Sequence, residues 1–107
     1  MIVKAWNNGT HHNDGNGYGI KITSRDRDQY FDPSWKTIIL DLDGENALVE
    51  VNINKTSFWT EACRELISKE IGKWLIKNKL APWPVGKPPV LEMVQMGERH
   101  FRLTKKG

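Results

Sequence analysis

Two neighbouring segments rich in β-branched residues constrain the fold most. Residues 35–42 read Trp-Lys-Thr-Ile-Ile-Leu-Asp-Leu, and residues 47–53 read Ala-Leu-Val-Glu-Val-Asn-Ile. The connection between them contains Asp43-Gly44, a dipeptide that accepts the positive φ of a tight turn. The two segments therefore predict an antiparallel β-hairpin. Side chains alternate between the two faces of a strand, so we expect one face of residues 47–53 to lie in the core, namely Val49, Val51 and Ile53.

Further segments of alternating polarity predict four more strands. Residues 1–6 and 18–22 precede the hairpin, and residues 90–96 and 99–105 form a second hairpin after it. In the last segment Phe101 and Leu103 lie on one face, which we expect to be buried. Between residue 18–22 and the first hairpin, Ser24 is a candidate N-cap for a helix of about one or two turns that ends before Pro33.

Residues 57–79 predict one long helix, because their apolar side chains recur at spacings of three and four. Thr56 or Ser57 would cap its first turn. Gly72 costs roughly 1 kcal/mol relative to alanine inside a helix, so either its backbone packs closely against another segment or the helix is locally weak. The apolar stripe of this predicted helix comprises Trp59, Cys63, Leu66, Ile67, Ile71, Trp74 and Leu75.

The predicted order of elements is β-β-β-β-α-β-β, with the short helix after the second strand. This order indicates a single α+β domain over residues 1–107, with a mostly antiparallel sheet of about six strands packed on one long helix. A chain of 107 residues buries roughly two-thirds of its unfolded surface, which is enough to hold a core without a metal or a disulfide. Four of the five prolines fall within residues 82–89 and predict a stiff, extended connector.

Cysteine content and hydropathy bear on the cellular compartment. Cys63 is the only cysteine, so an intramolecular disulfide is excluded and a reducing compartment is favoured. No apolar run approaches the roughly 18 residues of a membrane span, and the first residues turn polar too early for a signal peptide. We therefore expect a soluble, cytoplasmic domain without a membrane partner, whereas the oligomeric state is not specified.

The charge is unevenly distributed along the chain. The formal net charge of +3 divides into −3 for residues 1–68 and +6 for residues 69–107. Lys69, Lys73 and Lys77 follow one another at helical spacing and would form a straight basic row. Such a row attracts polyanions, because phosphate contacts release counterions and drive nucleic-acid binding. The alternative is a solvated helix face without a binding function, whose lysines pair with Glu65 and Glu70.

The C-terminal part adds further candidates for a nucleic-acid interface. Lys87 and Arg102 extend the basic region, and Trp83 lies between two prolines, where its indole could stack on an unpaired base. The alternative is that Trp83 folds back as a lid over the core. The Pro-Trp-Pro segment could also anchor a protein partner.

The polar stretch of residues 7–17 is a second candidate site. Gly15, Gly17 and Gly19 alternate and could form a concavity of backbone N–H groups for an anion. The stretch does not match the nucleotide-binding motifs of Rossmann folds or P-loops, because a strand follows it and no Lys-Ser or Lys-Thr is present. The alternative is a loop that uses its glycines only for turns.

His11 and His12 in this stretch are candidate general bases, and Arg25 or Arg27 is a candidate stabiliser of phosphate charge. These residues would serve a small metal-independent hydrolase or ribonuclease. However, the loop and Arg25 flank opposite ends of residues 18–22, which argues against one compact site. Adjacent histidines and a lone cysteine do not have metal-ligand spacing, so no metal or cofactor is expected.

Three functions therefore follow from the sequence. The leading prediction is a non-catalytic domain that binds nucleic acid through the basic helix face and the C-terminal hairpin. The alternatives are the hydrolase or ribonuclease and the protein-interaction module.

Overall fold

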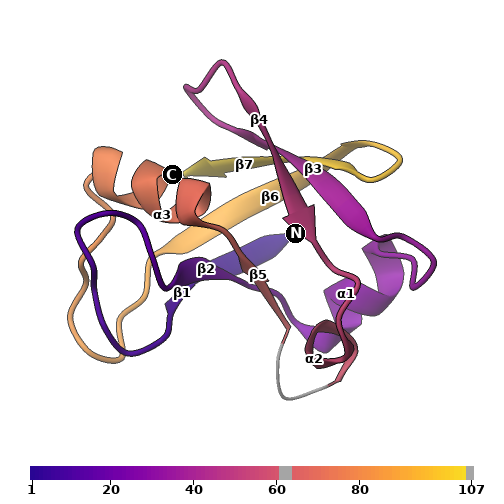
Figure 1. Cartoon of the computed structure of the whole chain (residues 1–107), viewed down its shortest axis with the longest axis horizontal. Helices are drawn as coiled ribbons and strands as arrows, with labels where there is room; N and C mark the ends of the chain where they lie inside the picture. Colours follow the sequence, from indigo (N-terminus) through magenta and orange to yellow (C-terminus); the bar gives the residue numbers. More distant parts are fainter. Residues whose placement is uncertain (61–63, 106–107) are drawn as a thin grey trace.

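The computed structural model describes residues 1–60 and 64–105, which form one mainly β unit with short helices (Figure 1). Its elements, in chain order, are β1 (Ile2–Asn7), β2 (Tyr18–Lys21), α1 (Ser24–Tyr30), β3 (Thr37–Leu42), β4 (Leu48–Asn52), α2 (Thr56–Trp59), β5 (Glu65–Ile67), α3 (Lys69–Lys77), β6 (Val90–Gly97) and β7 (His100–Lys105). The predicted α+β class is thus confirmed, and the Cα radius of gyration of 12.8 Å is that of a compact domain.

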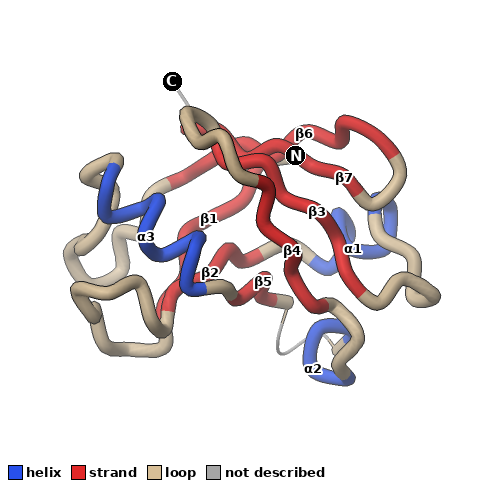
Figure 2. The backbone as a smooth tube through the Cα atoms, turned by 45° about the horizontal axis from the view of Figure 1, so that its top comes forward, coloured by secondary structure: helices blue, strands red, loops and turns tan. Residues whose placement is uncertain are grey.

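The strands form a single sheet in the order β4-β3-β7-β6-β1-β2-β5. All neighbouring pairs are antiparallel except β3 and β7, which run parallel. The sheet curls strongly, so that its two edge strands, β4 and β5, contact each other. α3 lies at one end of the curled sheet, and α1 and α2 lie at the other (Figure 2).

Both predicted hairpins are confirmed. β3 pairs with β4 in the register Leu40↔Val49, and β6 pairs with β7 in the register Met93↔Leu103. Gly44 has a φ of 85° in the first turn, which is the conformation that the Asp-Gly dipeptide favours. The alternation of side chains also holds, since Val51 is buried whereas Leu48 on the other face is 58% exposed.

The single long helix predicted over residues 57–79 is wrong. This segment contains the end of α2, the short strand β5 and α3. Ser68 is the N-cap of α3, and its Oγ accepts a hydrogen bond of 3.2 Å from the backbone N–H of Glu70. Cys63, which was assigned to the helical stripe, lies outside the described residues.

The additional strand has a simple physical reason. β5 pairs with the otherwise free edge of β2 in the register Ile20↔Leu66, which satisfies backbone groups that a helix would have satisfied internally. Leu66 is fully buried in this arrangement. A buried leucine in the middle of a short strand fits the apolar pattern as well as a helical stripe does, so the periodicity did not distinguish the two. The sheet consequently has seven strands instead of six.

The short helix after the second strand is confirmed, but its cap differs by one residue. Thr23, and not Ser24, is the N-cap of α1, because its Oγ1 accepts a hydrogen bond of 3.1 Å from Asp26 N–H. α1 ends at Tyr30, before Pro33 as predicted.

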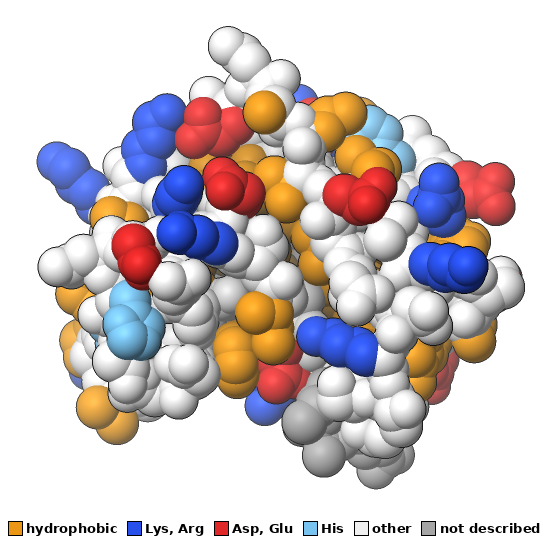
Figure 3. Space-filling view, in the orientation of Figure 1, with side chains coloured by type: hydrophobic (Ala, Val, Ile, Leu, Met, Phe, Trp, Pro, Cys, Tyr) orange, Lys and Arg blue, Asp and Glu red, His pale blue; other side chains and the backbone are white. Residues whose placement is uncertain are grey.

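α3 packs on the sheet through Ile71, Trp74 and Leu75, which are buried. Gly72 is also buried, and a Cβ at this position would overlap the carbonyl oxygen of Gly15. Of the two readings of Gly72, close packing of the backbone is therefore the one found. On the outer surface of this region, basic and acidic side chains are interspersed (Figure 3).

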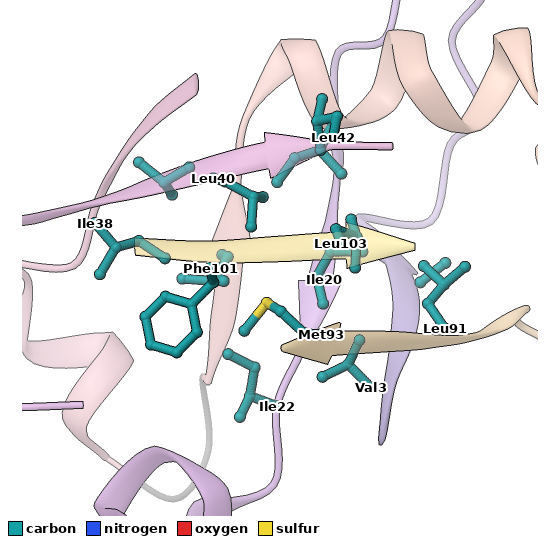
Figure 4. Packing of buried hydrophobic residues seen from close by; sticks show 14 of the residues in the cluster. Val3, Ile20, Ile22, Ile38, Leu40, Leu42, Leu91, Met93, Phe101 and Leu103 are labelled. Atoms are coloured by element: carbon teal, nitrogen blue, oxygen red, sulfur yellow. The ribbon is translucent and has the colours of Figure 1, made fainter. Parts of the chain in front are cut away.

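The core fills the inside of the curled sheet and is closed by one face of each helix. Strands from both halves of the chain contribute to it (Figure 4). Its side chains shown there are fully or almost fully buried: Val3, Ile20, Ile22, Ile38, Leu40, Leu42, Leu91, Met93, Phe101 and Leu103. Among the described residues, no helix combines the length and the hydropathy needed to cross a bilayer.

Candidate functional site

A broad groove lies on the outer face of β1 and β2. Its volume is about 1140 Å³. α1 bounds it on one side, and the proline-rich segment bounds it on the other. The side chains that line the groove and that matter here are Lys4, Trp6, Lys21, Arg25, Asp26, Tyr30, Arg64 and Trp83.

The strand pairing places Lys4 and Lys21 directly opposite each other. They are register partners on β1 and β2, and both are exposed. The Cβ atoms of such partners are typically about 4.5–5.5 Å apart, and like charges at this position repel. A bound anion would relieve this repulsion, so the pair is a natural position for a phosphate or carboxylate.

Arg25 adds a third cation from α1. Within the described part of the chain, neither Arg25 nor Lys4 nor Lys21 takes part in an ion pair. Among residues 1–60 and 64–105, Asp26 is the one acidic residue that lines the groove. The groove is therefore electropositive, and its three exposed cations are available to a ligand.

Arg27 points away from the groove, as the angular separation of two residues on a helix requires. It is buried, and its Nη1 donates to the backbone oxygens of Phe58 at 3.3 Å and Thr60 at 2.9 Å. Its guanidinium also lies 5.8 Å from the ring centroid of Trp59. Arg27 thus connects α1 to α2 and is a structural residue.

Three aromatic side chains accompany the cations of the groove. Trp6 is the outward-facing residue opposite Gly19, so no side chain of β2 covers the indole. Tyr30 comes from the end of α1, and Trp83 comes from the proline-rich segment. All three are partly exposed. Aromatic faces beside cations are the combination that single-stranded nucleic acids need, because bases stack while phosphates pair.

Trp83 is held in place by a cluster with His11 and Tyr18. The ring of His11 lies edge-on to Trp83 at 4.7 Å, and that of Tyr18 lies edge-on to it at 5.6 Å. His11 Nδ1 is 2.6 Å from the hydroxyl oxygen of Tyr18. Burial raises the pKa of the Tyr18 hydroxyl. Trp83 therefore packs partly against the core, as the lid alternative expected, and only part of its ring faces the groove.

The candidate catalytic residues do not share one hollow. Arg25 lines the groove, whereas His11 and His12 do not. His11 is engaged with Tyr18, and His12 is exposed at the surface of the loop. The loop and Arg25 lie at opposite ends of β2, so they do not form one compact site, as the sequence indicated.

The three glycines of the candidate anion loop lie against protein atoms. A Cβ on Gly15 would lie 2.6 Å from the carbonyl oxygen of Lys69, and one on Gly17 would lie 2.7 Å from Oδ1 of Asn8. Gly19 is equally close to the backbone of Leu66 on β5. These contacts explain each glycine by packing, and for Gly15 and Gly17 also by a positive φ.

The rest of the loop is fixed by short-range hydrogen bonds. Asn8 N–H donates to Gly17 O at 2.9 Å, and Asn16 N–H donates to the Asp14 carboxylate at 3.0 Å. This bond, assisted by the charge of Lys69, lowers the pKa of the Asp14 carboxyl. The loop is therefore tied to β2 and α3 at several points.

The predicted basic surface is largely neutralised. Lys73 pairs with Glu70 at 3.7 Å, and Lys77 pairs with Glu45 at 3.2 Å. Arg102 pairs with Asp43 at 2.8 Å and with Asp41 at 3.6 Å.

Two of the predicted nucleic-acid contacts keep an exposed ammonium group. Lys69 lies at the start of α3, and Lys87 lies in the proline-rich segment. The predicted surface therefore does not form one continuous unpaired row.

Lys4, Trp6 and Lys21 are the groove residues that sequence reasoning missed. A signal for them was present, since both segments were predicted as strands and these are their outward positions. What was lacking was the pairing of the two strands, which alone brings Lys4 next to Lys21.

Within residues 1–60 and 64–105, no group of three or more His, Cys, Asp or Glu side chains is arranged to hold a metal ion. Comparison with protein-family models, with curated proteins and with solved structures found no match for this chain. The functional argument therefore depends on the groove itself.

Proposed function

We propose that this domain binds single-stranded nucleic acid along the groove over β1 and β2, without catalysis. The observation that carries the proposal is the cross-strand pair Lys4 and Lys21, two like charges placed side by side, neither of which forms an ion pair with another described residue. Two phosphates of a single strand would replace their mutual repulsion by attraction. Arg25 supplies a further phosphate contact from the helix that bounds the groove.

The aromatic side chains favour a single strand over a duplex. Trp6 and Tyr30 line the same groove as the cations. An unpaired base can stack on an aromatic ring, whereas the bases of a duplex are already stacked on one another. Trp83 contributes through its exposed part, at the far side of the groove.

The predicted helix face of Lys69, Lys73 and Lys77 is the competing location for the same function. Two of its three lysines are engaged with Glu70 and Glu45. A polyanion would have to displace these carboxylates first. We therefore place the interface in the groove.

A binding experiment with matched variants tests the location. Fluorescence anisotropy would follow a labelled oligonucleotide of about 12 nucleotides, single-stranded or as a duplex, at several salt concentrations. The double variant Lys4→Gln/Lys21→Gln should weaken single-strand binding at least about tenfold and reduce the salt dependence of log K by about 1.4. The matched control, Lys69→Gln/Lys73→Gln, removes the same charge from α3 and should change affinity little.

The results separate the alternatives. Loss of binding in the α3 variant alone would move the interface to the predicted basic helix, and absence of any single-strand binding would refute the proposal. No observation favours the hydrolase, because His11, His12 and Arg25 are not gathered in one hollow.

A further inference from the structure

Asp26 is a carboxylate in the electropositive groove that the proposed phosphate contacts do not use. It lines the groove from α1 and is half-buried, so part of its side chain is open to a ligand. Its backbone N–H donates to Thr23 Oγ1 at 3.1 Å. Within residues 1–60 and 64–105, however, its carboxylate forms no ion pair, although Arg25 is its neighbour in the sequence. A negative charge at this position repels the phosphates of a bound strand, so its presence needs a reason.

The helix dipole does not supply the whole reason. An acidic residue in the first turn stabilises a helix, and Asp26 lies in the first turn of α1. That effect does not depend on which side of the helix carries the carboxylate. The dipole therefore explains an acidic residue near the start of α1, but it does not explain one on the side that lines the groove.

Four side chains of α1 line the groove in two rows. Arg25 and Gln29 form one row, and Asp26 and Tyr30 form the other. Arg25 and Gln29 are exposed, whereas Asp26 and Tyr30 are half-buried. Residues one helical turn apart have Cβ atoms about 5–6 Å from each other. Asp26 and Tyr30 are therefore direct neighbours along this wall of the groove.

This side of α1 matches the three parts of a nucleotide. Tyr30 offers an aromatic face on which a base can stack. Arg25 offers a guanidinium for a phosphate. Asp26 lies within one turn of both, where the sugar that joins base and phosphate would lie.

The chemistry of a carboxylate selects the kind of sugar. An ionised carboxylate only accepts hydrogen bonds, so it needs a donor. Inside a strand the 3′ and 5′ oxygens of each sugar are esterified, which leaves the 2′-hydroxyl of ribose as the only hydroxyl that can donate. Deoxyribose has no such group, and the 2′-hydroxyl is the feature by which proteins distinguish RNA from DNA.

We infer that the groove selects RNA over DNA, and that Asp26 accepts a hydrogen bond from the 2′-hydroxyl of a nucleotide whose base stacks on Tyr30. This inference rests on the proposed single-strand binding and names its substrate class. The carboxylate repels the phosphates of either strand, and only ribose compensates for the repulsion. Asp26 thus acts against DNA as well as in favour of RNA.

The experiment uses the whole chain and three labelled uracil strands of about 12 nucleotides, compared at one salt concentration. They differ only in the sugar, which is ribose, deoxyribose or 2′-O-methylribose. The 2′-O-methyl group keeps the oxygen but has no hydrogen to donate. The wild-type protein should bind the ribose strand about tenfold more tightly than either of the others, because hydrogen bonds to charged acceptors are strong. This series needs no variant and therefore does not depend on whether a mutant folds.

Asp26→Ala then tests the carboxylate. The variant should bind the three strands with nearly equal affinity. It should also bind the deoxyribose strand about two- to threefold more tightly than the wild type does, because one repulsive charge is removed. A purely structural role of Asp26 in the first turn of α1 would change the melting temperature, but it would leave the ratio of the three affinities unchanged.

Asp28→Ala is the matched control, because it removes the same charge from the same helix. Asp28 lies on the other side of α1, where its carboxylate pairs with Arg27 at 3.0 Å. This variant should retain the preference for ribose. Thermal melting establishes that both variants are folded.

The outcomes distinguish this inference from the proposed function. Equal binding of the ribose and deoxyribose strands by the wild type, or an undiminished ribose preference in Asp26→Ala, overturns the selection of RNA by Asp26 and leaves single-strand binding intact. Binding of the 2′-O-methyl strand as tight as that of the ribose strand also overturns it, because no hydroxyl hydrogen is then needed. Absence of binding to every strand refutes the proposed function and the inference with it.

Discussion

The carbonyl oxygen of Gly15 occupies the space in which any other residue at position 72 would carry its Cβ. This contact joins the loop of residues 7–17 to the middle of α3. It explains why a helix tolerates a glycine at its centre, since the close approach requires the missing side chain.

Gly72→Ala should therefore destabilise the protein, although alanine is the better helix former. Overpacking of this kind costs about 1–3 kcal/mol, which exceeds the roughly 1 kcal/mol gained in helix propensity. Chemical denaturation would measure the change. Gly97→Ala is the control, because the nearest atom to a Cβ there is 4.0 Å away, and it should be nearly neutral. Unchanged or increased stability of Gly72→Ala would contradict the contact.

Arg25 and Arg27 offer a matched pair on one helix. Arg27→Met should lower the free energy of unfolding by about 2–3 kcal/mol, because it leaves the carbonyls of Phe58 and Thr60 without their donor. Arg25→Met should change stability by less than about 0.5 kcal/mol, since Arg25 is exposed. In nucleic-acid binding the order reverses, and Arg25→Met should show the larger loss. Urea denaturation and anisotropy measure the two effects on the same samples.

Lys4→Glu should make the protein more stable and less able to bind. It converts the repulsive pair with Lys21 into an attractive one, worth about 0.5 kcal/mol at low ionic strength. The gain should disappear at high salt, where exposed charges are screened. Thermal melts at low and high salt measure this difference. A stability change that is independent of salt would show that charge repulsion is not its cause.

The raised pKa of Tyr18 predicts that the protein loses stability at high pH. Its pKa is raised above the ordinary value of 10.0 by burial, so the folded state retains the proton at a pH where the unfolded chain releases it. Its contribution is fully present below about pH 10 and is lost as the pH rises towards the folded-state pKa. Denaturation from about pH 9 to about pH 11 should show a steeper decline for the wild type than for Tyr18→Phe. Equal slopes would exclude Tyr18 as the titrating group.

The outcome for individual elements shows how far sequence reasoning reaches here. The β3–β4 hairpin was predictable because its two strands are adjacent in the chain and the Asp-Gly turn sets their direction. The existence of α1 and its end before Pro33 were predictable, and the predicted cap was one residue away from the actual one, Thr23. The segment from residue 57 to residue 79 was not, because a buried leucine at position 66 satisfies both a helical stripe and a short strand. Ser68 followed by Glu70 was the local sign that a new helix begins there.

In the candidate site, too, contacts between distant segments could not be predicted from the sequence. The lysines of α3 form a row in the sequence, but Glu45 reaches Lys77 from 32 residues away, and no local pattern indicates that pair. Trp83 appeared as an exposed platform, yet the ring of His11 packs against it from a distant loop.

The sequence by itself determined which residues alternate between the core and the surface, where two hairpins turn and, to within one residue at its start, the position of α1. These features depend on neighbours in the chain, through side-chain direction and turn conformation. Only the tertiary structure decided that β5 completes the sheet at the edge of β2, that Lys4 faces Lys21, and that Glu65 is buried. Such features depend on pairing between segments that are distant in the chain, and that pairing is set by the packing of the whole core.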